Sequence, residues 1–262
     1  MPQLGLGLYA MTDDEATRTI ERATELGYRA FDTASIYRNE AGVGRGLAGS
    51  GLPRDDVFVA TKLWNDDHPR DRVRPALEAS LDRLGLDYLD LFLIHWPAAQ
   101  GGSRLYLEAW EELLGARRDG LVRSVGVCNF AAEHLAEIDS AELEAPELNQ
   151  VELHPLHQQR ALRTMHLARG IVTQAWAPLA RGKALASPVV EAVSLETGRT
   201  PAQVVLRWHL QSGFSVIPKS SDPGRLAENM AVFDFALTQE QMDRIDSAET
   251  GELTDVALLR FL

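Results

Sequence analysis

The chain has 262 residues, 45% of them hydrophobic, which suits one closed α/β barrel of ~250 residues or two smaller domains. With 38 acidic and 26 basic residues its formal net charge is −12, which disfavours nucleic acid and anionic lipid as partners. Cys128 is the only cysteine, and neither a targeting signal nor a run of ~18 apolar residues is visible, so we expect a cytoplasmic protein without a disulfide or a membrane span.

Apolar runs of strand length alternate with segments of helical periodicity along the whole chain. The expected strands are Leu4–Leu8, Arg29–Asp32, Val57–Lys62, Tyr88–Ile94, Val122–Val127, Leu148–Leu153, Ile171–Trp176 and Phe214–Ile217. The expected helices are Asp13–Leu26, Glu40–Leu47, Asp71–Leu84, Leu105–Arg118, Ala131–Asp139, Ala161–Ala168, Ala202–Gln211, Arg225–Val232 and Thr238–Ser247. Eight strand–helix pairs without a linker predict an α/β protein with a single (β/α)8 TIM barrel domain over residues 1–262.

The apolar runs of three successive expected strands are each closed by an ionisable residue: Asp32, Lys62 and, directly after Ile94, His95. In a parallel barrel the carboxyl ends of all strands open on one face, so these side chains can share a pocket with Tyr37, which follows the first of them. A lysine beside a phenol stabilises the phenolate, and a carboxylate keeps that lysine charged. Tyr37, Lys62 and Asp32 supply these roles, and His95 can hydrogen-bond a substrate oxygen that gains negative charge. The pattern predicts an enzyme.

Each of these residues also has a structural interpretation. Asp32 and Lys62 could form a salt bridge at the barrel rim, Tyr37 could be an ordinary loop aromatic, and His95 a satisfied core histidine. Their joint placement at strand ends favours a site. Gly5–Ala10 fits the dinucleotide pattern G-x-G-x-x-A, but too few residues precede it for the strand that such a fingerprint must follow. We therefore assign its glycines to the first barrel strand.

Six segments carry a resemblance to a known family: Gly27–Ala34, Thr61–Asp66, Leu93–Pro97, Gly126–Phe130, Asn149–Pro155 and Ile217–Ser220. They resemble the aldo-keto reductase family, and especially its bacterial 2,5-diketo-D-gluconic acid reductase-like members. The similarity covers roughly Leu4 to Ala248, and so many separate matches in one order make it specific.

The resemblance implies an oxidoreductase acting on CH–OH groups, which reduces aldehydes and ketones such as diketones or sugar-derived carbonyls to alcohols. It implies that Tyr37 is the proton donor, tuned by Lys62 and Asp32, and that His95 orients the carbonyl while NADPH delivers hydride. It also implies that Trp176 stacks on the nicotinamide. The residues that it implies for cofactor binding are Cys128, Asn129, Gln150, Trp176, Pro178, Leu179, Gly182, Lys183, Lys219, Ser220, Ser221, Arg225, Glu228 and Asn229.

Two residues depart from the family pattern. Cys128 stands where many relatives have serine, which weakens the contact expected there. Asp222 stands where close relatives have a basic residue, which weakens the preference for NADPH and leaves NADH possible.

Tyr9, Trp64 and Trp96 are expected to contact the substrate together with His95. The loop after His95 is short, so the pocket should be open and accept varied small carbonyls. His154 and His157 have the H-x2-H spacing of some metal sites, but no further ligand pattern accompanies them, so we expect no metal.

The two ends of the chain carry further expectations. Relatives usually have an N-terminal hairpin that plugs the barrel bottom, and here that hairpin is expected to be missing. The apolar C-terminal segment Leu253–Leu262 is expected to pack on the barrel or on a neighbouring subunit. Otherwise we expect a monomer.

Two rival functions remain open. In a lyase or aldolase Lys62 would form a Schiff base, which needs an uncharged amine that a paired Asp32 opposes. In a nucleotide-sensing binding protein the same barrel would bind the cofactor with negligible turnover.

Overall fold

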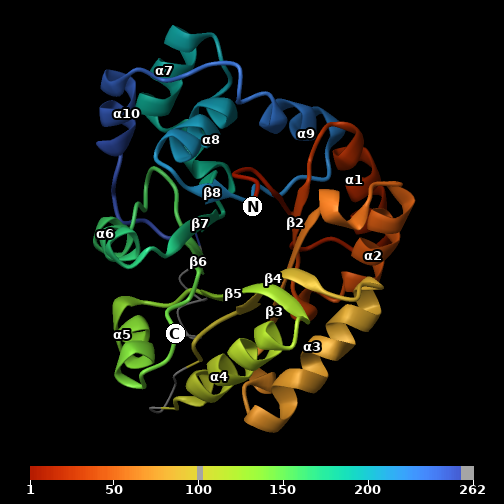
Figure 1. The fold of residues 1–262 in the computed structure, drawn as a ribbon. Coiled ribbons are helices and arrows are strands. Elements are labelled where there is room, and N and C mark those ends of the chain that lie inside the picture. Colours follow the sequence, from red (N-terminus) through yellow and green to blue (C-terminus); the bar gives the residue numbers. More distant parts are fainter. Residues whose placement is uncertain (99–102, 255–262) are drawn as a thin grey trace.

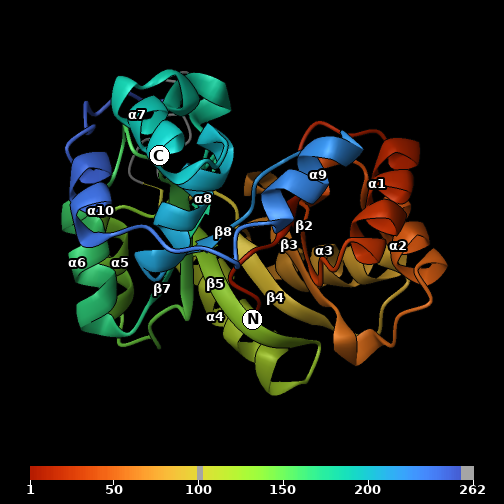
Figure 2. The same ribbon diagram turned by 90° about the horizontal axis from the view of Figure 1, so that it is seen from above.

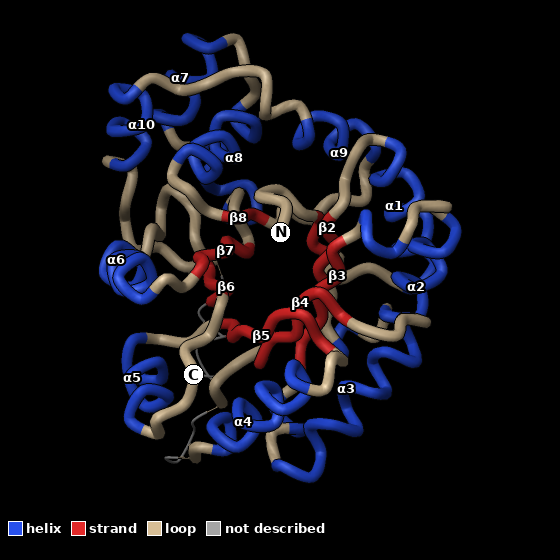
Figure 3. Tube along the Cα trace, in the orientation of Figure 1, coloured by secondary structure: helices blue, strands red, loops and turns tan. Residues whose placement is uncertain are grey.

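The computed structural model describes residues 1–98 and 103–254, and eight parallel strands dominate it. Each strand pairs with its neighbours in chain order, and the sheet then closes on itself. The N–H groups of Gly5 and Gly7 donate to the carbonyls of Val216 (2.8 Å) and Pro218 (3.1 Å), which joins β1 to β8. The predicted (β/α)8 fold is thus confirmed (Figure 1, Figure 3). The strands are β1 (Leu6–Gly7), β2 (Ala30–Asp32), β3 (Phe58–Leu63), β4 (Leu89–Ile94), β5 (Val122–Cys128), β6 (Leu148–Glu152), β7 (Val172–Trp176) and β8 (Ser215–Val216).

Helices cover the outside of the barrel in both ribbon views (Figure 1, Figure 2). They are α1 (Asp13–Glu25), α2 (Glu40–Gly49), α3 (Arg70–Leu84), α4 (Leu105–Arg118), α5 (Ala132–Ser140), α6 (Arg160–Arg169), α7 (Pro188–Thr197), α8 (Pro201–Gln211), α9 (Pro223–Met230) and α10 (Gln239–Asp246). The sequence does not predict α7, since its apolar residues do not share one face: Val190 and Val193 are buried, whereas Leu195 is 85% exposed.

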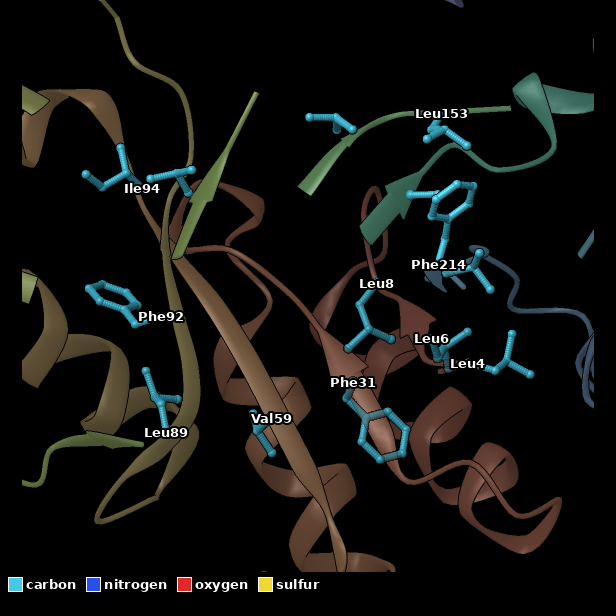
Figure 4. Packing of buried hydrophobic residues seen from close by; sticks show 14 of the residues in the cluster. Leu4, Leu6, Leu8, Phe31, Val59, Leu89, Phe92, Ile94, Leu153 and Phe214 are labelled. Carbon is cyan, nitrogen blue, oxygen red and sulfur yellow. The ribbon is translucent and has the colours of Figure 1, made fainter. Parts of the chain in front are cut away.

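The main apolar core lies between the strands and the surrounding helices (Figure 4). Leu6, Phe31 and Phe92 are buried there. A second, smaller cluster contains Leu91 and Leu93 of the same β4 strand. Because successive strand residues point to opposite faces, β4 has to be apolar on both faces, as strands covered on both sides are.

Two glycines let α2 approach its neighbours closely. A Cβ on Gly42 would lie 2.1 Å from the carbonyl oxygen of Asp13 in α1, and one on Gly44 would lie 2.3 Å from that of Leu84 in α3. These backbone contacts cannot move aside, so larger residues would push the helices apart. The glycines of this segment therefore serve packing.

Asp90 is the one acidic residue inside β4, and it forms an ion-pair cluster near the strand starts. Its carboxylate lies 2.7 Å from Arg54 and 3.3 Å from Arg123, and it accepts the N–H of Val59 at 2.9 Å. Both guanidinium groups stack on the ring of Tyr88, at 4.0 and 4.1 Å from its centroid. The cluster ties together the segments that enter β3, β4 and β5.

The described part of the chain has no helix with both the length and the apolar character needed to cross a membrane. Of the expected C-terminal contact segment only Leu253 and Thr254 are described, and residues 255–262 lie outside the described residues. Thr254 donates its N–H to Glu152 at 2.6 Å, and the N–H groups of Thr250 and Gly251 donate to the carbonyl of Leu156. This segment therefore runs along the loop that follows β6.

Candidate active site

A cavity of about 1060 Å³ opens at the carboxyl ends of the strands. Most of the residues predicted for a site line it. Those from the expected catalytic and substrate groups are Tyr9, Asp32, Tyr37, Trp64, His95 and Trp96. Those from the expected cofactor group are Cys128, Asn129, Gln150, Trp176, Pro178, Leu179, Gly182, Lys219, Ser220, Arg225, Glu228 and Asn229.

Lys62 lies behind this wall and forms a buried ion pair with Asp32. Its Nζ is 2.5 Å from Oδ1 of Asp32 and also donates to the carbonyl of Thr33 at 2.9 Å, with 1% of the lysine side chain exposed. Burial is the largest single influence and opposes the charged amine, but the charge and hydrogen bond of Asp32, together with the interactions with Tyr37 and Cys128, outweigh it and the pKa of Lys62 is raised. Lys62 therefore carries a fixed positive charge.

Tyr37 sits in a short 3-10 turn, Ser35–Tyr37, which the following residues anchor. Arg38 adopts a left-handed conformation with φ of 56°, which turns the chain into α2. The amide of the buried Asn39 donates to the carbonyls of Leu8 (2.8 Å) and Met11 (3.2 Å) and accepts the hydroxyl of Thr33 at 2.6 Å. The turn that carries Tyr37 is thus tied to the loop after β1.

The ammonium of Lys62 lies 5.3 Å from the centre of the Tyr37 ring. Burial raises the pKa of the Tyr37 phenol, and the charge of Lys62 acts against that rise without reversing it. A lysine beside a phenol is therefore only part of the balance at Tyr37, because desolvation of the phenolate is the larger effect here. Tyr37 is consequently protonated throughout the neutral range, with a cation beside it that stabilises the anion once the proton has left.

His95 completes this group from the end of β4. Its ring centre is 5.6 Å from that of Tyr37 and 5.3 Å from that of Trp64. Burial, with the nearby charge of Lys62, holds the pKa of His95 well below 6.5, so the ring is neutral. Its Nδ1 is buried without a hydrogen-bond partner among the described residues. A neutral imidazole at this position can donate one N–H into the cavity.

Trp176, Asn129 and Cys128, all expected to bind the cofactor, form a chain of side-chain contacts. The indole N–H of Trp176 donates to Oδ1 of Asn129 at 2.8 Å, and Nδ2 of Asn129 donates to the carbonyl of His95 at 3.1 Å and to Sγ of Cys128 at 3.1 Å. Gln150 lies beside them, with its Oε1 3.6 Å from Sγ of Cys128. Burial raises the pKa of the Cys128 thiol, so this residue is an un-ionised, poorly nucleophilic group.

The basic and serine residues expected to bind the cofactor fall into two groups. Lys219 and Arg225 are exposed side chains that line the cavity, as predicted, but Ser221 does not line it. Lys183 does not line it either, because its Nζ forms an ion pair with Glu252 at 2.5 Å. Arg181, two residues earlier, lines the cavity in its place.

Sequence reasoning missed Arg181 for an identifiable reason. Arg181 and Gly182 both have a positive φ, at 51° and 95°, which interrupts the 3-10 helix Ala180–Ala186 and redirects the chain. Side-chain direction after such a kink cannot be read from residue spacing. A non-glycine residue with positive φ beside a glycine was the only available signal, and it appears only in the structure.

The substrate end of the cavity is aromatic. Tyr9 is 57% exposed, and its ring centre lies 5.1 Å from that of Tyr37. Trp64 is half-buried and Trp96 is buried, and both line the cavity. Ile36, which the sequence analysis did not single out, lines the same end and is 39% exposed.

His154 and His157 belong to the loop after β6, where their backbones pair with each other. The imidazole of His154 lies 3.0 Å from the carboxylate of Glu152. Within residues 1–98 and 103–254, no group of histidine, cysteine and acidic side chains has the arrangement of a metal site.

Comparisons with known proteins agree with this geometry. The family model described as the Aldo/keto reductase family matches residues 3–250. An aldo-keto reductase of Mycolicibacterium smegmatis is 45% identical over 252 residues, covering 96% of this chain and 91% of that protein. Methylglyoxal reductase DkgA of Escherichia coli strain K12 is 44% identical over 254 residues, covering 96% and 91%. The crystal structure of a Gox0644 mutant in complex with NADPH superposes with a TM-score of 0.90 at 44% identity, covering 95% of this chain and 90% of that one.

Proposed function

Because this chain belongs to the aldo/keto reductase family, we propose that it reduces small aldehydes and ketones to alcohols with NADPH, using Tyr37 as the proton donor. The observation that carries the proposal is the arrangement on the cavity floor. Tyr37 and His95 face each other there, and the buried Lys62–Asp32 pair lies directly behind them. A relative named methylglyoxal reductase and a Gox0644 structure with NADPH support the reaction class and the cofactor.

The described residues fit a nicotinamide dinucleotide. Asn129 and Gln150 provide amide groups at the floor of the cavity beside Trp176, an aromatic surface for the nicotinamide. Lys219 and Arg225 supply cations suited to phosphate at the other end. When bound, the cofactor supplies the hydride that adds to the carbonyl carbon.

Side chains of the protein then orient and protonate the carbonyl oxygen of the substrate. His95 donates its N–H to the carbonyl oxygen and orients it, because the neutral ring keeps a proton without adding a second cation beside Lys62. Tyr37 gives its proton to the same oxygen as negative charge develops there, and Lys62 stabilises the phenolate that remains. Asp32 keeps the lysine charged and in place.

Lys62 does not support the Schiff-base alternative. It is not among the residues that line the cavity, and its pKa is raised, so a free amine that a substrate carbonyl could reach is not provided.

The decisive test compares Tyr37→Phe with the wild-type protein on a panel of small aldehydes and diketones, following NADPH absorbance. The substitution removes only the hydroxyl that carries the transferable proton, so turnover should fall by ~10²–10⁴. NADPH affinity, measured by tryptophan fluorescence, should stay within about twofold.

Tyr28→Phe is the matched control. This buried tyrosine donates its hydroxyl to the carbonyl of Leu226 at 3.1 Å, outside the cavity, so turnover should persist. Wild-type protein that binds NADPH but turns over none of the carbonyls would favour the nucleotide-sensing alternative. Comparable turnover in Tyr37→Phe would refute the assigned proton donor.

A further inference from the structure

A row of buried polar side chains crosses the barrel interior from the Lys62–Asp32 pair. The second carboxylate oxygen of Asp32 accepts from Nε2 of Gln150 at 2.8 Å, and the same nitrogen donates to Oε1 of Gln174 at 2.6 Å. Nε2 of Gln174 then donates to the hydroxyl of Ser215 at 3.0 Å. All of these residues are buried, with at most 5% of their surface exposed. The row links β2 to β6, β7 and β8, which lie around the barrel opening in Figure 3.

Hydrogen-bond chemistry fixes the direction of every amide in this row. An ionised carboxylate only accepts, so Gln150 must turn its nitrogen toward Asp32. The second N–H of that nitrogen needs an acceptor, which Gln174 provides with its oxygen. The nitrogen of Gln174 is then left to donate to Ser215. Gln174 therefore holds Gln150 in the one orientation that satisfies Asp32.

Packing alone does not explain a glutamine at this position. Burying an amide is costly unless its groups are hydrogen-bonded, and methionine would fill a similar volume without that cost. Gln174 is not among the residues lining the cavity, so direct contact with a substrate or cofactor does not explain it either. What remains is its contact with Gln150, and through Gln150 with Asp32.

We propose that Gln174 is a positioning residue for the carbonyl reduction: by holding the amide of Gln150, it keeps Asp32 aligned on the Lys62 ammonium behind Tyr37. The inference rests on the proposed function, because it concerns the proton donor of that reaction. Without the acceptor on Gln174, one N–H of Gln150 is left unpaired in the barrel interior, and Asp32 loses the support that fixes its second oxygen.

Two substitutions separate positioning from packing. Gln174→Met removes both hydrogen bonds at nearly constant volume, so kcat should fall roughly 3- to 10-fold, with KM for the carbonyl little changed. Gln174→Glu keeps an oxygen for the N–H of Gln150, and its other oxygen accepts the rotatable Ser215 hydroxyl. Part of the lost kcat should therefore return, limited by the added negative charge, which opposes the Tyr37 phenolate.

The glutamate variant should also move the pH profile. Its added negative charge disfavours the Tyr37 phenolate, which raises the pKa of the phenol. Reduction needs the protonated phenol, so activity falls as pH rises, and this alkaline decline should begin at a higher pH in Gln174→Glu than in the wild type. The added charge shifts the profile whatever the role of Gln174, so the shift reports that the introduced carboxyl is ionised, and the kcat of Gln174→Met together with the Lys62 resonance separates positioning from packing.

Gln158→Met provides the control. Gln158 is fully buried and donates to the carbonyls of Pro155 and Asp246, both at 2.9 Å, away from the barrel interior. Its replacement should lower the unfolding midpoint and leave the pH profile and kcat unchanged. The amine nitrogen resonance of Lys62, followed by NMR, should shift in Gln174→Met and remain in place in Gln158→Met.

The proposal is overturned if Gln174→Met keeps wild-type kcat and an unshifted Lys62 resonance, or if Gln174→Glu loses as much kcat as Gln174→Met. Failure of the proposed function looks different, because the wild-type protein itself would then reduce none of the carbonyls. The NMR comparison reports on Lys62 in either case.

Discussion

Asp32 and Asp90 are both strand carboxylates with 4% exposure, and both form ion pairs, yet the two regions do different work. Asp32 ends β2 beside the cavity and pairs with a lysine. Asp90, near the start of β4, pairs with Arg54 and Arg123. Both kinds of partner cation stay charged, the arginines by their chemistry and Lys62 through its raised pKa, so the two ion pairs differ in position: Asp32 lines the cavity and Asp90 does not. Burial and charge pairing therefore do not identify a site unless the pair also lies at a cavity.

Among the substitutions considered for these two regions, Lys62→Met should have the largest effect on turnover. Removing the cation leaves Asp32 unpaired in the barrel interior, which costs about 3–5 kcal/mol of unfolding free energy. It also leaves the phenolate of Tyr37 without its stabilising charge, so turnover should fall by ~10³. Urea unfolding and NADPH oxidation measure the two effects, and a variant with unimpaired turnover would place Asp32 in the same structural class as Asp90.

The stability of the folded protein should itself depend on pH, and this limits the pH range in which the Lys62 and Asp90 variants can be compared. Burial lowers the pKa of His68, His166 and His209 from 6.5 to about 4, so below pH 6.5 the unfolded chain takes up protons that the folded chain does not. The unfolding free energy should be insensitive to these groups above pH 6.5 and fall between pH 6.5 and 4.

Each of these three histidines should contribute a loss of about 2 kcal/mol by pH 5. Urea unfolding at a series of pH values measures the total. The variants at Lys62 and Asp90 are therefore best compared above pH 6.5. A flat stability between pH 6.5 and 5 would contradict the neutral, buried state of these rings.

Asp90→Asn should affect stability without affecting catalysis. The amide keeps an acceptor for the N–H of Val59 but removes the charge that Arg54 and Arg123 share, and both arginines can turn partly to water. We expect a loss of about 2–4 kcal/mol in unfolding free energy and a kcat within about twofold of wild type. A large drop in kcat with unchanged stability would show that Asp90 also contributes to catalysis and would contradict its purely structural role.

A third carboxylate, on Asp222, extends the comparison to an exposed position. Asp222 caps α9, accepting the N–H of Arg225 at 2.8 Å, and lies in the sequence between Lys219 and Arg225, which both line the cavity. Asp222→Asn keeps a good cap and removes one negative charge. The NADPH over NADH preference in kcat/KM should rise about 2- to 5-fold at low salt and less at high salt. An unchanged preference at both ionic strengths would show that Asp222 has no influence on the choice of cofactor.

Much of the fold follows from the sequence because it depends on local periodicity. Every strand found in the structure overlaps an expected apolar run, and the expected helix Ala202–Gln211 is α8, which Thr200 caps by accepting from the N–H of Gln203. Helix α7 is the exception, since Leu195 faces solvent and blurs the pattern. Asp32, Lys62, Tyr37 and His95 were found because strand ends of one barrel share a face, and the structure brings them together as expected.

The rest of the site depends on directions that spacing does not encode. Lys183 and Arg181 lie on the same loop, but a kink turns Arg181 toward the cavity, while Lys183 pairs with Glu252 from a distant part of the chain. Gln174 looks like an ordinary polar residue in an apolar strand until its contacts with Gln150 and Ser215 are seen.

The sequence by itself determined the closed barrel and the identity of its ionisable strand ends, because alternation of apolar runs and the shared face of parallel strands are properties of local chain geometry. Only the tertiary structure decided the protonation of Tyr37, where burial outweighs the charge of Lys62, and the row of amides that supports Asp32. Desolvation and hydrogen-bond direction depend on groups from distant strands, and these meet only after the barrel has closed.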